Sequence, residues 1–400
     1  MAIRTVTDAI RYVGVDDNTL ALFENQYPVQ PMGVSYNSYV ILDEKIAVMD
    51  SVDARAAEEW LSNVAQVLGG RNPDYLVVTH MEPDHSGSLM RIAQEYPEMK
   101  IVGNAKTFTL IKQFFGTGAL SEDRMLEVGE RDTLSLGLHR LRFLLAPMVH
   151  WPETMVTWCA EAGTLFSGDA FGTFGAIDGG ITDSQIDPSR YWDEMRRYYA
   201  CIVGKYGGPV QKALAKVRGL NPTTICSTHG PVWQREIPQV MDVYDRLSRY
   251  EGEPGVVIAY GSMYGNTEQM AERIARELAA EGVGPIFVHN MSYADESIVL
   301  RDVFRYDTLI VGGPTYNGGL YPPVARLLDL IAARCVPQRN FGWFGSFCWA
   351  SAAVRCLGEF AQKMKWEAIC EPVEMKQGFS PAWHEACHAL AARIAGCMHR

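Results

Sequence analysis

The sequence predicts two α/β domains that join near residue 250. Its 400 residues exceed what one ordinary hydrophobic core holds together. A polar patch rich in glycine and proline, Glu251-Gly252-Glu253-Pro254-Gly255, stands between a helical stretch and a strand-like run. The order of strands and helices also changes at this point. We therefore expect one domain over residues 1–250 and a second over residues 251–400.

The first domain mixes short strands with helices, which predicts a layered α/β fold whose sheets are mixed or antiparallel. Asp187-Pro188 is a favourable helix start, and the turn residues Gly230-Pro231 precede another helical stretch. The expected helices cover residues 54–68, 189–203 and 232–250, and the expected strands cover 39–42, 46–49, 76–79, 141–145, 155–158 and 223–227.

The second domain alternates apolar strands with helices. Alternation of this kind predicts βαβ units and a parallel, doubly wound sheet. The segments, in chain order and beginning with a strand, are 256–260, 267–281, 285–289, 308–312, 323–333, 342–347 and 354–365.

Composition excludes several classes of protein. A net charge of -11 argues against nucleic acid as a partner. The N-terminus lacks an apolar signal core and no apolar run is long enough to span a bilayer, so we expect a cytoplasmic protein without a membrane partner. The nine cysteines are odd in number and include no Cys-x-x-Cys pair. A disulfide framework, an iron-sulfur cluster and a rubredoxin-type iron site are therefore not expected.

The segment His80-Met81-Glu82-Pro83-Asp84-His85 carries four potential metal ligands directly after an apolar strand. One ion rarely takes all its ligands from so short a loop, so the density indicates two ions side by side. Three further candidates, His150, Asp169 and His229, each stand at or just past an apolar strand. Because strand ends on one edge of a sheet can converge, these loops are predicted to form one site.

The pattern resembles the metallo-β-lactamase fold, an αββα sandwich, with Glu82 where that family has a second histidine. A carboxylate there hardens the site and favours iron over zinc. With this replacement the chain resembles the flavodiiron proteins. The resemblance implies that His80, Glu82 and His150 hold the first iron, that Asp169 bridges, and that the second iron is held by Asp84, His85 and His229. In some relatives the equivalent of His85 is turned off the metal.

Three loops of the second domain follow strands at the edge where doubly wound sheets bind ligands. The first is rich in hydroxyls and glycine and opens a helix, which suits a phosphate. The arrangement resembles flavodoxin, a doubly wound parallel sheet, and implies FMN. The third loop has Cys348 and Ala350 where flavodiiron relatives often have glycine and serine. The candidate contacts are Ser262, Met263, Tyr264, Gly265, Asn266 and Thr267, then Pro314, Thr315, Tyr316, Asn317 and Gly318, then Ser346, Phe347, Cys348, Trp349 and Ala350. For Trp349 simple core packing is the alternative.

The resemblance to flavodiiron proteins implies an oxidoreductase that reduces O2 to water, NO to N2O, or both, with electrons passing through FMN from an external donor. A rubredoxin-like protein is the first expectation for the donor, and a reduced deazaflavin the second. Relatives work as head-to-tail homodimers or as tetramers made of such dimers. The sequence leaves two alternatives: a dizinc hydrolase fused to a flavodoxin domain, and an electron carrier with a vestigial metal site. It does not decide between the two gases.

Residues near the expected ligands are candidates to line the site. Trp151 follows His150, and the pair Tyr198-Tyr199 falls in an amphipathic stretch, for which core packing is the favoured interpretation.

Overall fold

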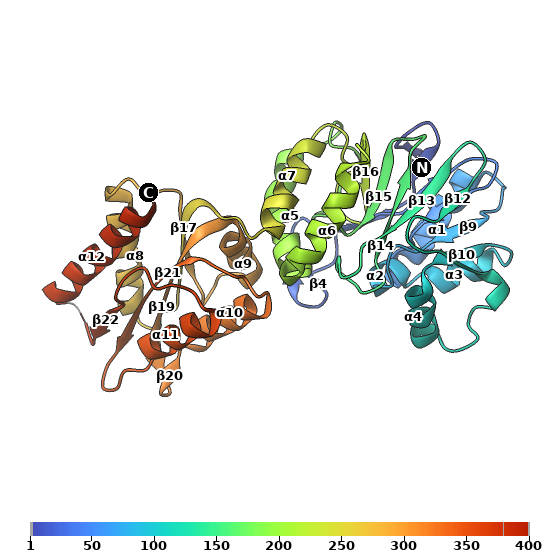
Figure 1. The fold of residues 1–400 in the computed structure, drawn as a ribbon. Helices are drawn as coiled ribbons and strands as arrows, with labels where there is room; N and C mark the ends of the chain where they lie inside the picture. Colours follow the sequence, from blue (N-terminus) through green and yellow to red (C-terminus); the bar gives the residue numbers. More distant parts are fainter. Residues whose placement is uncertain (1–2, 379, 399–400) are drawn as a thin grey trace. The chain divides into compact units, whose positions relative to one another are not determined.

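The computed structural model describes residues 3–378 and 380–398 of the chain. Contacts divide it into two compact units, Met1–Ser248 and Arg249–Arg400. Figure 1 shows both, the first coloured blue to yellow and the second yellow to red. Each is described by itself below.

The first unit contains two mixed sheets. The larger one has seven strands. Neighbouring strands pair antiparallel along β1-β2-β7-β8 and parallel along β8-β9-β10-β11. Its strands, in sheet order, are β1 (Arg4–Thr5), β2 (Ile10–Tyr12), β7 (Tyr39–Ile41), β8 (Ala47–Met49), β9 (Tyr75–Val77), β10 (Lys100–Gly103) and β11 (Met125–Glu127).

The smaller sheet has five strands, antiparallel except for the last pair, which is parallel. They are β12 (Thr133–Ser135), β13 (Arg140–Leu145), β14 (Met155–Cys159), β15 (Thr164–Gly168) and β16 (Thr224–Ser227). Two short ribbons pair β3 (Val15–Asp17) with β6 (Val34–Tyr36) and β4 (Leu22–Phe23) with β5 (Tyr27–Pro28). Because parallel and antiparallel pairs occur together, the expected mixed architecture is confirmed.

Helices cover both sides of the paired sheets in Figure 1, with α1 to α4 on one side and α5 to α7 on the other. Helix α1 shows why: its buried residues Ala57, Trp60, Val64 and Leu68 recur every three or four positions and form one apolar stripe. The helical segments of this unit are η1 (Ala54–Ala56), α1 (Ala57–Leu68), α2 (Pro83–Ser86), α3 (Leu89–Glu95), α4 (Ala105–Phe115), η2 (Glu122–Arg124), η3 (Pro188–Tyr191), α5 (Trp192–Tyr198), η4 (Tyr199–Val203), η5 (Gly204–Tyr206), α6 (Gly207–Arg218) and α7 (Ile237–Ser248).

Two of the expected helices differ from the structure. The helix expected over 189–203 is divided into η3, α5 and the π-helix η4. The helix expected from residue 232 begins only at Ile237. The residues just before Ile237, which were expected to be helical, bond to other segments instead. Trp233 exchanges backbone hydrogen bonds with Ile225, and the Asp183 carboxylate accepts three consecutive backbone N–H groups from residues 234–236. These tertiary bonds outweigh the local helical pattern.

The second unit is a parallel sheet in the order β18-β17-β19-β21-β22, with β20 antiparallel on β19. Helices α8 and α12 share a core with one face of the sheet, and α9, α10 and α11 lie on the other side in Figure 1. This order is that of a doubly wound flavodoxin-like sheet. The elements are β17 (Glu253–Tyr260), α8 (Asn266–Ala280), β18 (Ile286–Asn290), α9 (Glu296–Arg305), β19 (Tyr306–Tyr316), β20 (Gly319–Leu320), α10 (Pro322–Ala333), β21 (Asn340–Phe347), α11 (Ala353–Met364), β22 (Val373–Lys376) and α12 (Pro381–Met398).

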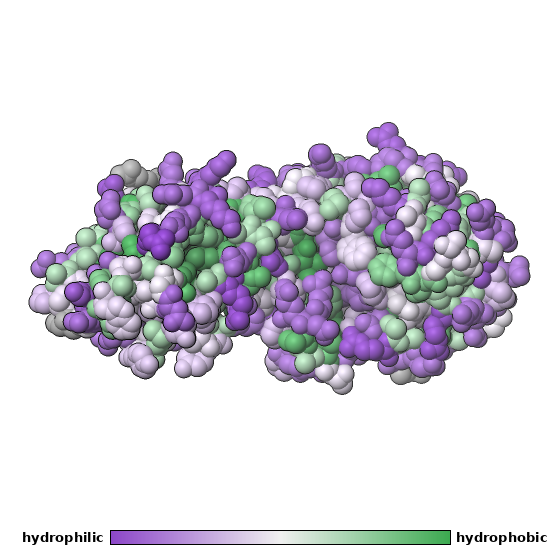
Figure 2. Space-filling view, turned by 90° about the horizontal axis from the view of Figure 1, so that it is seen from below, coloured by the Kyte–Doolittle hydropathy of each residue, from purple (hydrophilic) through white to green (hydrophobic). Residues whose placement is uncertain are grey.

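The surface is mixed in character. Figure 2 shows one face of the molecule, on which hydrophilic side chains predominate and hydrophobic ones lie in recesses between them. Among residues 3–378 and 380–398, no helix combines the length and the apolar character that a membrane crossing requires.

Candidate metal centre and flavin pocket

The predicted metal ligands of the first unit converge at the ends of its strands. His80 and Glu82 follow β9, and Asp84 and His85 belong to the short helix α2, which starts with Pro83 at its first position. The other three follow strands of the second sheet: His150 follows β13, Asp169 follows β15 and His229 follows β16. All seven side chains fall into two adjoining groups whose ligand atoms lie within 4.8 Å of one another in each group.

The first group consists of His80, Glu82, His150 and Asp169. His150 Nε2 lies 2.8 Å from Glu82 Oε2 and 3.0 Å from Asp169 Oδ2. His80 Nε2 lies 3.2 Å from the same Asp169 oxygen. Two ring nitrogens and two carboxylate oxygens thus face one point.

The second group consists of Asp84, His85 and His229. His229 Nε2 is 3.2 Å, and His85 Nε2 is 3.3 Å, from Asp84 Oδ2. The two Nε2 atoms are 3.0 Å apart. His85 Nε2 also lies 3.2 Å from Asp169 Oδ1, so His85 points into the centre here. Asp169 therefore presents one oxygen to each group.

Hydrogen bonds behind the ligands fix their orientation. His229 Nδ1 lies 2.7 Å from the backbone oxygen of Ser35, and this bond requires the proton on Nδ1. The Nε2 lone pair of His229 is then free to point into the centre.

The Tyr198 ring packs against His229 at a centroid distance of 5.4 Å, whereas Tyr199 packs against Tyr244. Of the candidate pair, Tyr198 lines the site and Tyr199 lies in the core.

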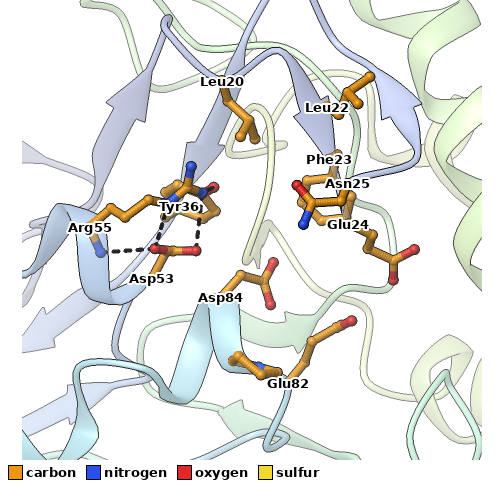
Figure 3. A pocket seen from close by; sticks show the side chains of 11 residues that line it. Leu20, Leu22, Phe23, Glu24, Asn25, Tyr36, Asp53, Arg55, Glu82 and Asp84 are labelled. Carbon is orange, nitrogen blue, oxygen red and sulfur yellow. Dashed lines mark hydrogen bonds and ion pairs between the residues drawn. The ribbon is translucent and has the colours of Figure 1, made fainter.

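A pocket of about 460 Å³ opens beside the carboxylates of Glu82 and Asp84 (Figure 3). Its apolar wall is formed by Leu20, Leu22 and Phe23. The opposite side, as Figure 3 shows, carries a polar group in which Arg55 bonds to Asp53 and to the Tyr36 hydroxyl, and Glu24 and Asn25 complete the lining.

Glu24 is a pocket residue that sequence reasoning missed. It lies in the turn between β4 and β5, where Glu24 and Asn25 both have positive φ, at 50° and 52°. Burial and then the neighbouring Glu82 carboxylate raise the pKa of Glu24 to about 7. The turn is the only local feature of the sequence that marks Glu24, because the tertiary fold brings this residue close to the ligands.

A second pocket, of about 500 Å³, lies at the carboxyl ends of the parallel strands in the second unit. Its lining includes every predicted flavin contact except Gly265, which has φ +88 and precedes helix α8. Gln377, just past β22, also lines it and was missed by sequence reasoning. Its backbone N–H donates to the Phe347 oxygen at 2.7 Å, which brings a fourth loop to the pocket.

The flavin loops are tied to one another. The Thr267 and Ser346 hydroxyls are 2.8 Å apart and buried, which joins the first loop to the third. Thr315 Oγ1 accepts the backbone N–H groups of Ala352 and Ala353, at 2.9 and 3.1 Å, and so caps α11 from the second loop. The alternative that Trp349 packs in the core is wrong, because its side chain is 90% exposed.

Comparisons with known proteins agree with both sites. Residues 34–230 match the family described as ODP family beta lactamase, and residues 258–385 match Flavodoxin. A nitric oxide reductase from Moorella thermoacetica is 31% identical over 396 residues, which are 98% of this chain and 97% of that protein. Two solved structures match 100% of this chain at a TM-score of 0.93. They are a rubredoxin oxygen:oxidoreductase from Desulfovibrio gigas, 29% identical with 99% of its chain covered, and the flavodiiron protein from Giardia intestinalis, 26% identical with 98% covered.

The chain belongs to the flavodiiron family. This confirms the predicted fold class, a lactamase-like domain followed by a flavodoxin-like one, and the oxidoreductase class. FMN and a pair of iron ions are the cofactors of this flavodiiron chain. The dizinc hydrolase alternative finds no support among these relatives.

The first unit is chemically suited to hold the iron ions of a flavodiiron protein. Both carboxylate oxygens of Asp84 are buried and make no hydrogen bond among the described residues. Buried polar atoms without partners are costly, and cations would satisfy these. Four imidazoles with three carboxylates form a mixed nitrogen and oxygen donor set of the kind that binds iron.

The ionisation of the side chains in the two ligand groups shows the same demand for positive charge. Burial alone would lower the pKa of His150, but hydrogen bonds to Asp169 and Glu82 raise it to about 10. Burial would raise the pKa of Glu82, but hydrogen bonds from His150 and His80 hold it well below its usual range. The raised pKa values of His80, His85 and His150 thus reflect the negative charge that the carboxylates concentrate here.

We expect iron binding to release protons. Coordination requires neutral imidazoles, whereas the raised pKa of His150 keeps it protonated at pH 7 in the metal-free protein. The apparent affinity for Fe²⁺ should therefore increase from pH 6 to pH 8, by about tenfold per pH unit for each proton released. Anaerobic calorimetry in two buffers of different ionisation enthalpy counts these protons. A pH-independent affinity with no buffer dependence would contradict the expectation.

Proposed function

We propose that this flavodiiron chain reduces O2 to water, NO to N2O, or both, at a diiron centre supplied with electrons by FMN. The observation that carries the proposal is the pair of adjoining ligand groups that share Asp169. The names of the relatives support it, since one is a nitric oxide reductase and another a rubredoxin oxygen:oxidoreductase. When bound, the iron pair supplies the redox chemistry at the gas and FMN stores the electrons.

We assign His80, Glu82 and His150 to the first iron, Asp84, His85 and His229 to the second, and Asp169 to both. The distances between the ligand atoms support this division. The pocket beside Glu82 and Asp84 leads a gas molecule to the centre. Its apolar wall of Leu20, Leu22 and Phe23 offers a small neutral molecule a surface beside the charged groups.

We assign FMN to the pocket of the second unit, with its phosphate at the start of α8. Backbone N–H groups at a helix N-terminus favour an anion, and the hydroxyls of Ser262, Thr267 and Ser346 lie at this pocket. We propose a rubredoxin-like protein as the external donor, in keeping with the name of the Desulfovibrio gigas relative, with a reduced deazaflavin as the second candidate. We place the domain boundary between residues 250 and 251, beside the change of compact unit after Ser248.

Loss of His150 should abolish turnover with both gases. A His150→Ala protein should lose roughly 100-fold or more, because even changes behind the ligands cost 10–100-fold. The matched control is His139→Ala: His139 pairs with Asp43 in the same unit and belongs to neither ligand group. Anaerobic assays of the reduced protein with O2 and with NO measure both rates, and their ratio defines the substrate preference. Full activity in His150→Ala would favour the electron-carrier alternative.

Removing one hydroxyl from the phosphate loop should weaken FMN binding. Thr267→Val keeps the shape but loses a donor, and a hydrogen bond to a charged group contributes about 1.5–3 kcal/mol. The dissociation constant of FMN should therefore rise by roughly tenfold or more, measured by quenching of flavin fluorescence. Thr308→Val, near the start of β19 in the same unit, is the control and should bind FMN normally, because Thr308 does not line the pocket. Equal affinities for FMN in the two variants would show that the Thr267 hydroxyl does not bind the phosphate.

We further propose a head-to-tail homodimer in which a second copy covers the mouth of the flavin pocket. Tyr264 and Trp349 are each 90% exposed there, and Met263 and Tyr316 are also exposed. Large exposed hydrophobic groups around a site indicate an interface. The second copy brings its metal centre to this flavin, so electrons need not cross open solvent.

A double variant at this rim should separate the copies. Tyr264→Asp with Trp349→Asp should give a monomer by light scattering that keeps its iron and loses at least roughly tenfold in turnover per bound FMN, since a buried unpaired charge is costly at an interface. Tyr293→Asp is the control, because Tyr293 is 89% exposed in the same unit but does not line the pocket. A wild-type monomer with normal turnover would contradict the proposed dimer.

A further inference from the structure

Glu153 is a buried carboxylate beside the metal centre that belongs to neither ligand group. Its side chain is only 1% exposed. Oε1 accepts the backbone N–H of Met81 at 2.7 Å. Met81 stands between His80 and Glu82, so this bond fixes the turn that spaces two ligands of the first iron.

The backbone of Glu153 joins further segments to the same point. Its carbonyl oxygen accepts from the Asn104 side-chain amide at 2.5 Å. Asn104 also caps helix α4 by accepting the N–H groups of Lys106 and Thr107. Glu153 itself lies three residues past His150 in the loop that enters β14. It therefore connects the loop of His80 and Glu82 with the loop of His150.

The second carboxylate oxygen of Glu153 needs a separate explanation. Oε2 is buried and has no hydrogen-bond partner among the residues that the structure describes. Glutamine would supply the same accepting oxygen to Met81, so the backbone bond alone does not call for an acid. What glutamate adds is a negative charge, and a buried unpaired charge is costly unless cations lie near it. The ligand groups next to Met81 provide that place for cations.

We infer that Glu153 is a positioning residue that sets the spacing of His80 and Glu82 on the first iron and, through its charge, lowers the reduction potential of that iron. The inference rests on the diiron function proposed above. A fixed negative charge stabilises the ferric state relative to the ferrous state. Its two oxygens have different roles: Oε1 accepts the backbone N–H of Met81, and Oε2 is buried and makes no hydrogen bond among the described residues.

Glu153→Gln separates the two roles because it keeps an accepting oxygen and removes the charge. In the iron-loaded, FMN-loaded protein we expect normal iron content and a more positive iron potential. At a fixed poise the ratio of reduced to oxidised iron should rise roughly tenfold, which is about 59 mV for a one-electron couple. An anaerobic redox titration followed by electron paramagnetic resonance measures it. Glu161→Gln, at the other end of β14, makes the same charge change on an exposed residue and should leave the potential unchanged.

Glu153→Ala removes the acceptor as well and leaves the Met81 N–H buried without a partner. We expect its affinity for Fe²⁺ to fall by roughly 10–100-fold, the usual effect of losing a group that orients metal ligands. Glu153→Gln should restore most of this affinity. Normal affinity in Glu153→Ala would overturn the positioning role, and an unchanged potential in iron-loaded Glu153→Gln would overturn the role of the charge. Wild-type protein that binds no iron would instead refute the proposed function.

Discussion

The carboxylate of Asp169 is the constraint on which the first unit depends. Its Oδ2 faces His80 and His150, its Oδ1 faces His85, and the residue is only 1% exposed. A carboxylate so deeply buried is tolerable only beside positive charge and hydrogen-bond donors. One donor is the Thr228 hydroxyl, at 2.5 Å from Oδ1. The strands of both sheets must therefore end close to Asp169, and the two-sheet architecture makes that convergence possible.

Where the strand ends meet, several residues close to the ligands adopt a strained backbone conformation. Asp50, Met148 and Phe171 all have positive φ, at 53°, 64° and 68°. Such backbones persist for non-glycine residues only where neighbouring bonds fix them. Asp50 is fixed by accepting both the N–H and the hydroxyl of Thr79, the residue before His80. The hydrogen bonds that offset the strain are thus the same ones that orient the metal loop.

The sequence predicted those parts of the fold and site that rest on residue type and order. The seven metal-site candidates form a pattern in the chain, and the strand-loop-helix order indicated the loops that line the second pocket. Glu24, Glu153 and Gln377 were not predicted, because each is a single polar residue whose partner lies on another element. The late start of α7 has a similar cause, since Asp183 is far from it in sequence. Local patterns carry no information about such distant partners.

The two cofactors place opposite demands on the residues around them. Metal ligands must be buried, because water would compete for the ions and screen the charges that hold them; accordingly His80, His85 and His229 are at most 1% exposed. The flavin pocket is instead edged by the exposed aromatic rings of Tyr264 and Trp349. The chain answers these demands with two compact units, each with its own core and its own site.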